Sequence, residues 1–438
     1  MAMKIKPFRA FRFNKEVVGD PARCIAPPYD VITAGQQKEL YNKSDYNVVR
    51  LIKGRQRPGD SDENNQYTRA AEYLRDWIDS GALRKDESEG IYGYIQDFEL
   101  AGTRHRRLSF IAMGRLEEFG KTVRPHEETL EKPKIDRLRL NMATGAGLGL
   151  VFMLYDDDRQ IAETFLETQL QKQPLLDLTD ESDVRHRLFA ISDPRAIQKM
   201  TRMMADKECI IADGHHRYET GLNYYRQMGK LGEAYQMMAF SNIRDDGFVL
   251  LPTHRIVKGL NDFDARDFLQ KLGDDFELKS FEFSNSKGMA EAKTAMFSFI
   301  TSQEDKAKCA FGIYAGEGAF YAAVLTDESV MNEVASDKSS GWKSLSVSVL
   351  HKLVLDRQLG ISDEDLASGE NVEYVKDTGD GLDNCVEKID SGDGQLVFFL
   401  TPVRLEQLKA VTKSGEKMPQ KSTFFYPKMY SGLTISEL

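Results

Sequence analysis

The sequence predicts an α/β protein with mixed sheets of the α+β kind, divided into two α/β domains. Short apolar runs typical of strands alternate with amphipathic stretches of helical period along the chain. The length of 438 residues exceeds that of one average domain, so two domains are the natural expectation. We predict a first domain over residues 1–243, a second over 244–412, and a C-terminal segment, 413–438, that packs back on the functional site.

The composition is that of a soluble globular protein. Hydrophobic residues make up 41% of the chain and charged residues 29%, and the net charge of −10 argues against broad electrostatic binding to DNA or acidic membranes. The longest apolar run, residues 148–155, is far too short to span a bilayer. The N-terminus lacks the apolar core of a signal peptide, and the four cysteines match no zinc or CxxC spacing. We expect a cytoplasmic protein that binds neither nucleic acid nor membrane.

Hydrophobic period and capping residues predict the elements of the first domain. Over residues 67–78, apolar side chains occur every three or four residues, which is the pattern of an amphipathic helix. Asp193 and Pro194 supply an N-cap and a first-turn proline for a helix over 194–206. The basic cluster at 104–107 is typical of a solvated hairpin edge. Further expected segments are helices at 36–41 and 159–171, strands at 46–52, 91–100, 106–115 and 150–155, and polar loops at 55–65 and 122–136.

From residue 236 onward, short apolar runs typical of strands again alternate with stretches of helical period. Residues 236–243 and 248–257 are expected to pair as a hairpin across an Asp-Asp-Gly turn. A second hairpin is expected from 309–314 and 320–325. The other expected segments are helices at 265–272, 289–302, 345–358, 383–388 and 404–411, and a buried strand at 395–401.

One stretch, residues 208–228 (ECIIADGHHRYETGLNYYRQM), organises the rest. Its first residues form a short apolar run that fits a buried strand, an Asp-Gly pair breaks that pattern, and later apolar residues have helical spacing. His215, His216 and Arg217 therefore fall at the start of a helix, where backbone N–H groups attract anions and Arg adds a forked donor. We hypothesise that this turn binds phosphate.

Two polar loops offer further titratable groups. Adjacent prolines stiffen the segment that presents Tyr29 and Asp30, which suits a catalytic carboxylate, although Asp30 as the cap of the following helix is an open alternative. The loop at 122–136 contributes His126 and Glu127 and suits an active-site wall, with solvated loop charge as its alternative. The pair His126-Glu127 lacks the HExxH spacing of zinc hydrolases.

The C-terminal segment is rich in aromatic side chains that are costly to leave in water, so we expect it to pack on the body of the protein. It would carry Lys421, Ser422 and Thr423 toward a cleft. A lysine beside hydroxyls suits a phosphoryl group, but no P-loop glycines precede it. His254 and Arg255 lie in an expected strand and either face the same cavity or are satisfied within the sheet.

The chain contains five distinctive motifs: PPYDVI (27–32), NVVRL (47–51), ADGHHRYET (212–220), LPTHR (251–255) and MPQKSTFFYPK (418–428). In combination they resemble a prokaryotic family catalogued as domain of unknown function 1015, and the resemblance spans nearly the whole chain. It implies that the first domain is similar to the ParB/sulfiredoxin superfamily. In that superfamily a Gly-x-x-Arg turn opening a helix binds nucleotide phosphates, and Gly214 through Arg217 fit this pattern.

The resemblance also implies an activity, because a branch of that superfamily phosphorylates free L-serine. We therefore expect a kinase acting on a small hydroxylated metabolite, with ATP or ADP as donor, Mg²⁺ as cofactor, and a homodimer as one open oligomeric state. The candidate residues are Asp30 and His216 for catalysis; Gly214, His215, His216, Arg217, Lys421, Ser422 and Thr423 for the phosphates; Asp213 and Glu127 for Mg²⁺; and Tyr29, His126, His254 and Arg255 for the pocket.

Two other functions stay open on sequence alone. A ParB-like nucleotide-binding or DNA-associated protein without metabolite chemistry would need a basic face, which the acidic composition opposes. A metal-dependent hydrolase would use the histidines at 126, 215, 216 and 254. These lack the ligand spacing of any familiar metal site.

Overall fold

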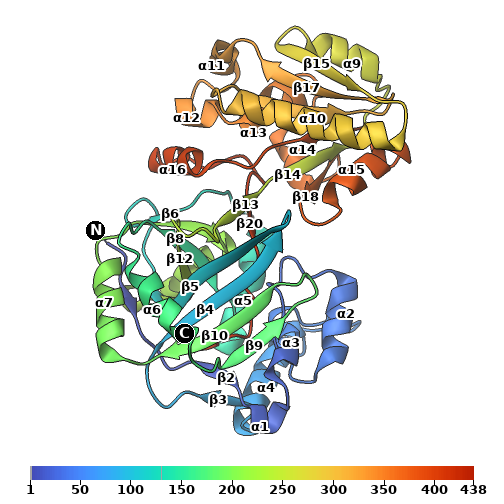
Figure 1. Cartoon of the computed structure of the whole chain (residues 1–438). Coiled ribbons are helices and arrows are strands. Elements are labelled where there is room, and N and C mark those ends of the chain that lie inside the picture. Colours follow the sequence, from blue (N-terminus) through green and yellow to red (C-terminus); the bar gives the residue numbers. More distant parts are fainter. Residues whose placement is uncertain (1, 130) are drawn as a thin grey trace. The chain divides into compact units, whose positions relative to one another are not determined.

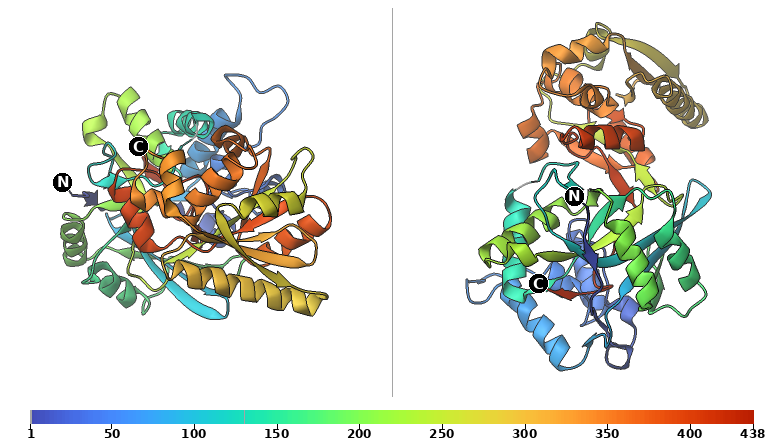
Figure 2. Two further views of the ribbon diagram at one scale, coloured as in Figure 1. Left: turned by 90° about the horizontal axis from the view of Figure 1, so that it is seen from above. Right: turned by 90° about the vertical axis from the view of Figure 1, so that its left-hand side faces the viewer.

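The computed structural model describes residues 2–129 and 131–438, which divide into two compact units. Unit 1 comprises Met1–Pro125, Thr129–Val249 and Pro427–Leu438, and unit 2 comprises His126–Glu128 and Leu250–Tyr426. Segments near both ends of the chain thus belong to unit 1 (Figure 2). The predicted α/β class with mixed sheets is confirmed, while the domain borders after residues 243 and 412 stay a prediction. Among the described helices, none has the length and apolar character needed to cross a membrane.

Unit 1 is built on a nine-stranded mixed sheet (Figure 1). Its strands are β1 (Ile5–Lys6), β4 (Ile91–Leu100), β5 (Thr103–Arg115), β6 (Val123–Arg124), β8 (Val151–Tyr155), β9 (Leu176–Thr179), β10 (Arg185–Ile191), β11 (Cys209–Asp213) and β12 (Tyr235–Asn242). The order is β6-β11-β8-β12-β5-β4-β10-β9, with β1 added on β5. β11 pairs in parallel with β6, and β12 with β8, while the other ladders are antiparallel. Two short ladders join β2 (Phe11–Phe13) to β3 (Leu83–Lys85) and β7 (Ala146–Gly147) to β21 (Ser436–Glu437).

Helices cover one apolar face of this sheet. Alternate side chains of its strands, Ile95 and Phe110 among them, share one hydrophobic core with Leu166, Met200 and Leu222 of three helices. The helices of unit 1 are α1 (Lys15–Val18), η1 (Pro21–Arg23), α2 (Ala34–Lys43), α3 (Val49–Ile52), α4 (Gln66–Asp79), α5 (Glu131–Thr144), α6 (Ile161–Gln169), α7 (Pro194–Met204), α8 (His215–Gln227) and η2 (Leu231–Glu233). The helices predicted at 67–78, 159–171 and 194–206 are confirmed, whereas the loop predicted at 122–136 contains β6 and the start of α5.

The opposite face of the sheet carries polar side chains and the C-terminal strap, Pro427–Leu438. Arg107 on β5 is wholly buried there and donates to Gln96 Oε1 and, at 2.5 Å, to the carbonyl O of Pro427. Burial lowers the pKa of Arg107 to about 10. The prediction of a solvated edge at 104–107 is therefore wrong for Arg107, because strand alternation turns it toward the face that the strap covers.

Residues 46–52, predicted as a strand, instead end in the short helix α3. The cause is the wholly buried side chain of Asn47, which donates to the carbonyl oxygens of Arg23 at 2.8 Å and Ile25 at 3.1 Å. Its Oδ1 accepts from the backbone N–H two residues on, at 3.0 Å. These contacts favour a helical turn over the extended conformation that the valines prefer.

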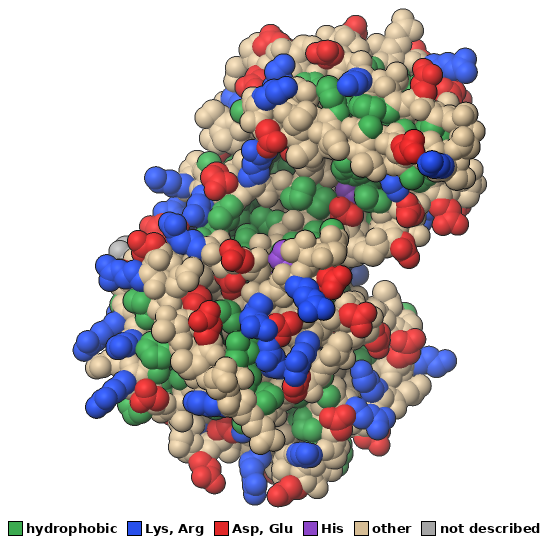
Figure 3. Space-filling view, viewed as in Figure 1, with side chains coloured by type: hydrophobic (Ala, Val, Ile, Leu, Met, Phe, Trp, Pro, Cys, Tyr) green, Lys and Arg blue, Asp and Glu red, His purple; other side chains and the backbone are tan. Residues whose placement is uncertain are grey.

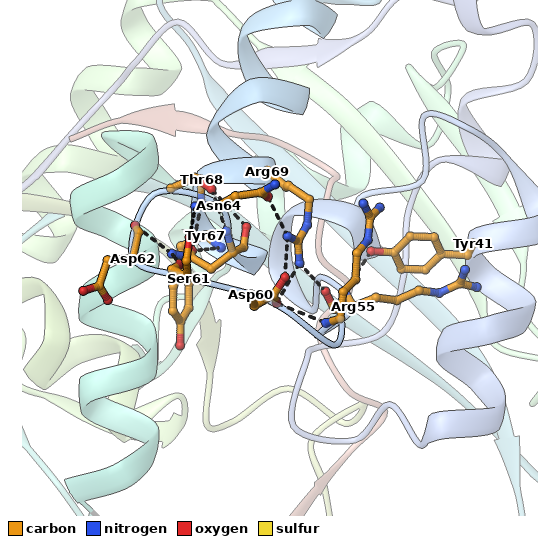
Figure 4. A network of polar contacts seen from close by, with 11 residues as sticks. Tyr41, Arg55, Asp60, Ser61, Asp62, Asn64, Tyr67, Thr68 and Arg69 are labelled. Carbon is orange, nitrogen blue, oxygen red and sulfur yellow. Dashed lines mark hydrogen bonds and ion pairs between the residues drawn. The ribbon is translucent and has the colours of Figure 1, made fainter.

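The polar loop expected at 55–65 is held by contacts from α4 (Figure 4). Arg69 donates to both carboxylate oxygens of Asp60, at 2.7 and 2.9 Å. On the same helix, Tyr67 OH donates to Asp136 of α5 at 2.7 Å. The loop is thereby connected to α5, a helix that lines the candidate site.

Unit 2 is built on a six-stranded antiparallel sheet of order β15-β17-β16-β19-β14-β18. Its strands are β14 (Thr253–Val257), β15 (Phe276–Glu282), β16 (Ala310–Tyr314), β17 (Ala319–Leu325), β18 (Val372–Lys376), β19 (Leu396–Phe399) and, outside the sheet, β20 (Phe424–Tyr426). Helix α10 (Ser286–Glu304) lies along the sheet and shares a core with Phe320 and Phe399 (Figure 1). The other helices are α9 (Ala265–Leu272), η3 (Glu328–Val330), α11 (Met331–Val334), α12 (Ser340–Lys343), α13 (Ser346–Val349), α14 (Asp363–Ser368), α15 (Gly381–Asp390) and α16 (Leu405–Lys413).

Most segments predicted for unit 2 are confirmed, including the hairpin of β16 and β17. The helix predicted at 345–358 is α13 followed by a π-helical stretch, Leu350–Asp356. The hairpin predicted from 236–243 and 248–257 is wrong, because β12 pairs with β5 and β8 while β14 pairs with β18 and β19. Asp245 in the intervening turn accepts from Leu108 N at 2.7 Å, so this turn is fixed to β5 and closes no hairpin.

The buried amide of Asn47 makes a stability test. We expect Asn47→Ala to lower the free energy of unfolding by about 2 kcal/mol, because two backbone carbonyls lose their donor. Urea denaturation measures this loss. The control is Asn42→Ala on the exposed side of α2, where a change within about 0.5 kcal/mol is expected. Equal effects of the two substitutions would contradict the role given to Asn47.

Candidate functional site

The central turn, residues 213–217, joins β11 to α8 as the sequence predicted. Gly214 occupies the N-cap position with φ 89°, a left-handed backbone that favours glycine. Because Gly214 has no side chain, the N-cap residue itself makes no side-chain cap hydrogen bond to α8. The first N–H groups of a helix have no partner within it, so the helix start is electropositive.

Arg217 folds back over this turn. A Cβ on Gly214 would lie 2.9 Å from Arg217 Nε, so a larger residue there would displace the guanidinium. Arg217 donates to the carbonyl O of Leu150, and its Nη2 lies 3.4 Å from the Asp213 carboxylate. The guanidinium is therefore buried and held in one orientation by protein contacts.

Asp213 is a carboxylate placed between two cations. Lys428 Nζ donates to Asp213 Oδ2 at 3.3 Å, and Gly214 N donates to Oδ1 at 2.9 Å. Burial would raise the pKa of Asp213, but Lys428 and Arg217 outweigh it and hold that pKa well below its usual range. Arg217 and Lys428 thus place two cationic side chains beside Asp213 at the start of α8.

Lys428 is the residue of this cluster that the sequence analysis missed. It is the second lysine of the MPQKSTFFYPK motif, whose first lysine, Lys421, was the predicted phosphate ligand. The available signal was the motif itself, which placed the C-terminal segment at the site. Which lysine reaches the turn depends on the path of the strap, and no local pattern encodes that path.

The segment that presents Tyr29 and Asp30 also lies in unit 1. Lys53 Nζ donates to the carbonyl O of Tyr29 at 2.9 Å, and the Arg137 guanidinium lies 4.0 Å from the Tyr29 ring centroid. Burial raises the pKa of the Tyr29 hydroxyl, and Arg137 and Arg217 partly offset that rise. The loop and the central turn therefore share one electrostatic environment.

Tyr29 and Arg217 line the same small cavity. Its volume is about 30 Å³, room for about one water molecule. The wall also contains Arg137 and polar side chains from α5, α8, β12 and the strap, namely Asn141, Thr220, Gln236 and Ser431. The structure thus brings together two residues that the sequence predicted from separate motifs.

Asp30 and the two histidines differ in accessibility. Asp30 is exposed, and the alternative that it caps α2 is wrong, because Thr33 Oγ1 accepts from Gln36 N at 3.2 Å and completes a capping box. His215 is buried, whereas His216 is half-buried. His216 is therefore the more accessible imidazole of the turn.

The other predicted site residues belong to unit 2. His126 Nε2 and Thr423 Oγ1 form a hydrogen bond of 2.8 Å, and Glu127 is half-buried. Ser422 is buried and donates to a carbonyl within its own turn. Lys421 is exposed with φ 55°, a strained backbone for a residue other than glycine.

His254 and Arg255 are wholly buried on β14. His254 Nδ1 accepts from Leu400 N at 3.3 Å, and burial lowers the pKa of His254 to about 3, so the ring is neutral at pH 7. Arg255 donates to the carbonyl O of Lys421 at 3.0 Å, and burial lowers its pKa to about 10. Each side chain is only partly satisfied, because within the described chain His254 Nε2 and Arg255 Nε are buried without a hydrogen-bond partner.

Mg²⁺ binding at Asp213 and Glu127 stays a prediction. Within residues 2–129 and 131–438, no three His, Cys, Asp or Glu side chains gather in a way that suits a metal ion. The Asp213 oxygens are engaged by Gly214 N and two cations. In phosphate-transferring proteins Mg²⁺ is usually held by one or two carboxylates together with substrate phosphates and waters, and we derive no step through it.

The fold and the central turn define a two-unit α/β protein whose first unit holds a carboxylate between two cations at a helix N-terminus. The chain belongs to the family described as "Protein of unknown function (DUF1015)", whose model matches residues 5–348. A comparison with curated proteins found no match.

Several solved structures are similar to this chain at low identity. A variant of a free serine kinase in complex with AMP is 13% identical, with a TM-score of 0.34, 69% of this chain covered and 84% of that chain. Another variant of a free serine kinase, in complex with ADP, is 13% identical, with a TM-score of 0.33 and 71% and 89% covered. SbnI with a C-terminal truncation, from Staphylococcus aureus, is 10% identical, with a TM-score of 0.33 and 72% and 84% covered.

Removing the carboxylate charge of the central turn tests its role. We expect Asp213→Asn to lower the free energy of unfolding by about 3 kcal/mol at pH 7, because Arg217 and Lys428 lose their counter-charge. The folded-state pKa of Asp213 is depressed, so its stabilisation is complete above the ordinary value of 3.8 and is lost as pH falls below it. The difference in the free energy of unfolding between wild type and Asp213→Asn should therefore become smaller as the pH falls from 5 to 3.

Urea denaturation at several pH values measures this difference. The matched control is Asp62→Asn, on an exposed loop residue, which should change stability by no more than about 0.5 kcal/mol. Two outcomes would show that Arg217 and Lys428 do not need Asp213 as a counter-charge. One is a loss of unfolding free energy in Asp213→Asn that stays constant down to pH 3, and the other is a loss equal to that of the control.

Proposed function

We propose that this protein is a nucleotide-dependent kinase that phosphorylates a small hydroxylated metabolite, with free L-serine as the first acceptor to test. The observation that carries the proposal is the start of α8, where the cationic side chains of Arg217 and Lys428 both contact the carboxylate of Asp213. A helix N-terminus with two cationic side chains beside it is suited to nucleotide phosphates. The resemblance of this turn to a phosphate-binding Gly-x-x-Arg turn supports the same reading.

In this proposal the phosphates of the nucleotide contact the N–H groups at the start of α8, with Arg217 and Lys428 supplying positive charge. The cavity beside Arg217, at about 30 Å³, is too small for a nucleotide. The phosphates would therefore approach from the side on which His216 is accessible, and His216 would donate to a phosphate oxygen. The positive groups would stabilise the charge that gathers on the transferred phosphoryl group.

Asp30 is the proposed general base. It is exposed, and its charge acts on Lys53, a lysine that fixes the neighbouring loop backbone. Asp30 would accept the proton of the acceptor hydroxyl as the new oxygen–phosphorus bond forms. The bond between the terminal phosphorus and its bridging oxygen breaks, and ADP leaves if ATP is the donor, or AMP if ADP is the donor. The roles predicted for Lys421, Ser422 and Thr423 remain predictions about unit 2.

Nucleotide binding can be measured without knowing the acceptor. We expect ATP or ADP to raise the thermal midpoint of the full chain, and Arg217→Lys to weaken the apparent affinity at least about tenfold, because lysine lacks the forked donor. The matched control is Arg226→Lys on the exposed part of α8, which should leave the shift unchanged. Equal shifts in wild type and Arg217→Lys would remove the central turn from nucleotide binding.

Turnover tests the chemistry. The full chain with Mg²⁺, ATP or ADP and L-serine should form O-phosphoserine, detected by phosphorus NMR, and Asp30→Asn should lower the rate by about 100-fold or more while the thermal midpoint stays unchanged. Glu39→Gln, an exposed change on α2, is the control and should keep full activity. The assay is repeated with L-threonine and glycerol. No phosphorylated product from any acceptor would refute the proposed activity, and full activity of Asp30→Asn would refute its role as base.

A further inference from the structure

Unit 1 contains a second, larger cavity between α6 and α7. Its volume is about 560 Å³, within the range of small-molecule sites. Ile161, Phe165 and Met203 form an apolar part of its wall. Met203 belongs to the hydrophobic core of the unit, and Ile161 and Phe165 pack against that core. The apolar surface of this cavity is therefore held in place by the fold itself.

Basic side chains surround this apolar surface. Arg159, Lys199 and Arg202 line the cavity, and within the described part of the chain none of them forms an ion pair with a carboxylate. The Lys199 ammonium instead lies 5.7 Å from the centroid of the Phe165 ring. Figure 3 shows Lys and Arg side chains gathered along the edge of unit 1 where Figure 1 draws α7. Unpaired cations beside apolar surface favour an anionic ligand.

The carboxylates of the same cavity are mostly engaged. Asp157 accepts from the N–H of Ile161 at 3.0 Å and pairs with Lys207 at 3.1 Å, so it caps α6. Asp206 lies 3.7 Å from the same lysine. Among the described lining residues, Asp158 is the carboxylate that has no ion pair. Three unpaired cations therefore face one unpaired carboxylate, and the balance is positive.

We propose that this cavity binds a small organic anion with an apolar body, of the class that joins a phosphate to an aromatic or short aliphatic group. The apolar part would lie on Phe165 and Met203, and the anionic group would contact Lys199 and Arg202. This cavity shares no lining residue with the small cavity beside the central turn. The ligand is therefore a second one, separate from the nucleotide, and its binding does not depend on the proposed kinase activity.

Phenyl phosphate is the probe, titrated into the full chain by isothermal calorimetry. We expect saturable binding to one site and at least tenfold weaker binding in the double variant Lys199→Glu, Arg202→Glu. The matched control is Arg195→Glu, an exposed arginine of the same helix that does not line the cavity. An equal loss in Arg195→Glu would assign the effect to the general charge of α7 and overturn the proposal, as would undiminished binding in the double variant.

Three further arms define the ligand class. Inorganic phosphate should bind at least tenfold more weakly than phenyl phosphate, and equal affinity would show that the apolar surface plays no part. Saturating ATP should leave phenyl phosphate binding unchanged, whereas competition would mean that the cavity belongs to the nucleotide site. Vesicles of phosphatidylglycerol should not sediment the protein. Sedimentation that the double variant abolishes, without phenyl phosphate binding, would assign this face to a lipid surface and overturn the proposal.

Discussion

The ion pair between Lys428 and Asp213 is the contact on which the arrangement of unit 1 depends. It joins residues 215 positions apart in the chain and returns the C-terminal strap to the turn at the start of α8. The strap then pairs with the N-terminal segments, through a bridge from Ser431 to Ala26 and another from Ile435 to Phe11. One long-range charge pair thus lies where three distant parts of the chain meet.

Buried polar groups hold the C-terminal segment in each unit. In unit 1, Arg107 donates to the carbonyl O of Pro427, and Tyr430 OH donates to Asp180 at 2.9 Å beside the His186 ring. In unit 2, Arg255 donates to the carbonyl O of Lys421. A buried guanidinium is costly unless its N–H groups are bonded, so these carbonyls offset part of that cost. The segment is therefore fixed by specific donors and not by aromatic burial alone.

Two cavities of unit 1, the small one beside Arg217 and the larger one between α6 and α7, use positive charge in different ways. At the central turn, Arg217 and Lys428 are already paired with Asp213, so a ligand there must share cations that the fold has fixed in place. Between α6 and α7, Lys199 and Arg202 are exposed, and no carboxylate of the described chain pairs with them. At the central turn the cationic side chains are held in a defined geometry, which suits group transfer. The larger cavity leaves charge available over apolar surface, which suits reversible binding of an anion.

The sequence by itself determined the strand, turn and helix around Gly214, because an apolar run, an Asp-Gly break and helical spacing are local signals. The motif that begins at Met418 led to the prediction that the C-terminal segment packs on the site, and Lys428 of this motif contacts Asp213. Local signals did not determine the partners of these segments. The buried side chain of Asn47 turned a predicted strand into a helix, because its acceptors lie more than twenty residues away.

Tertiary structure alone decided which strands pair and which lysine neutralises Asp213. The apolar pattern of β12 fits a strand in any sheet, and only the packing of its faces selected β5 and β8 over the next strand in sequence. Lys421 and Lys428 belong to one motif and are equally charged. The path of the strap across the sheet brought Lys428 to the carboxylate, because that path depends on contacts spread over the whole of unit 1.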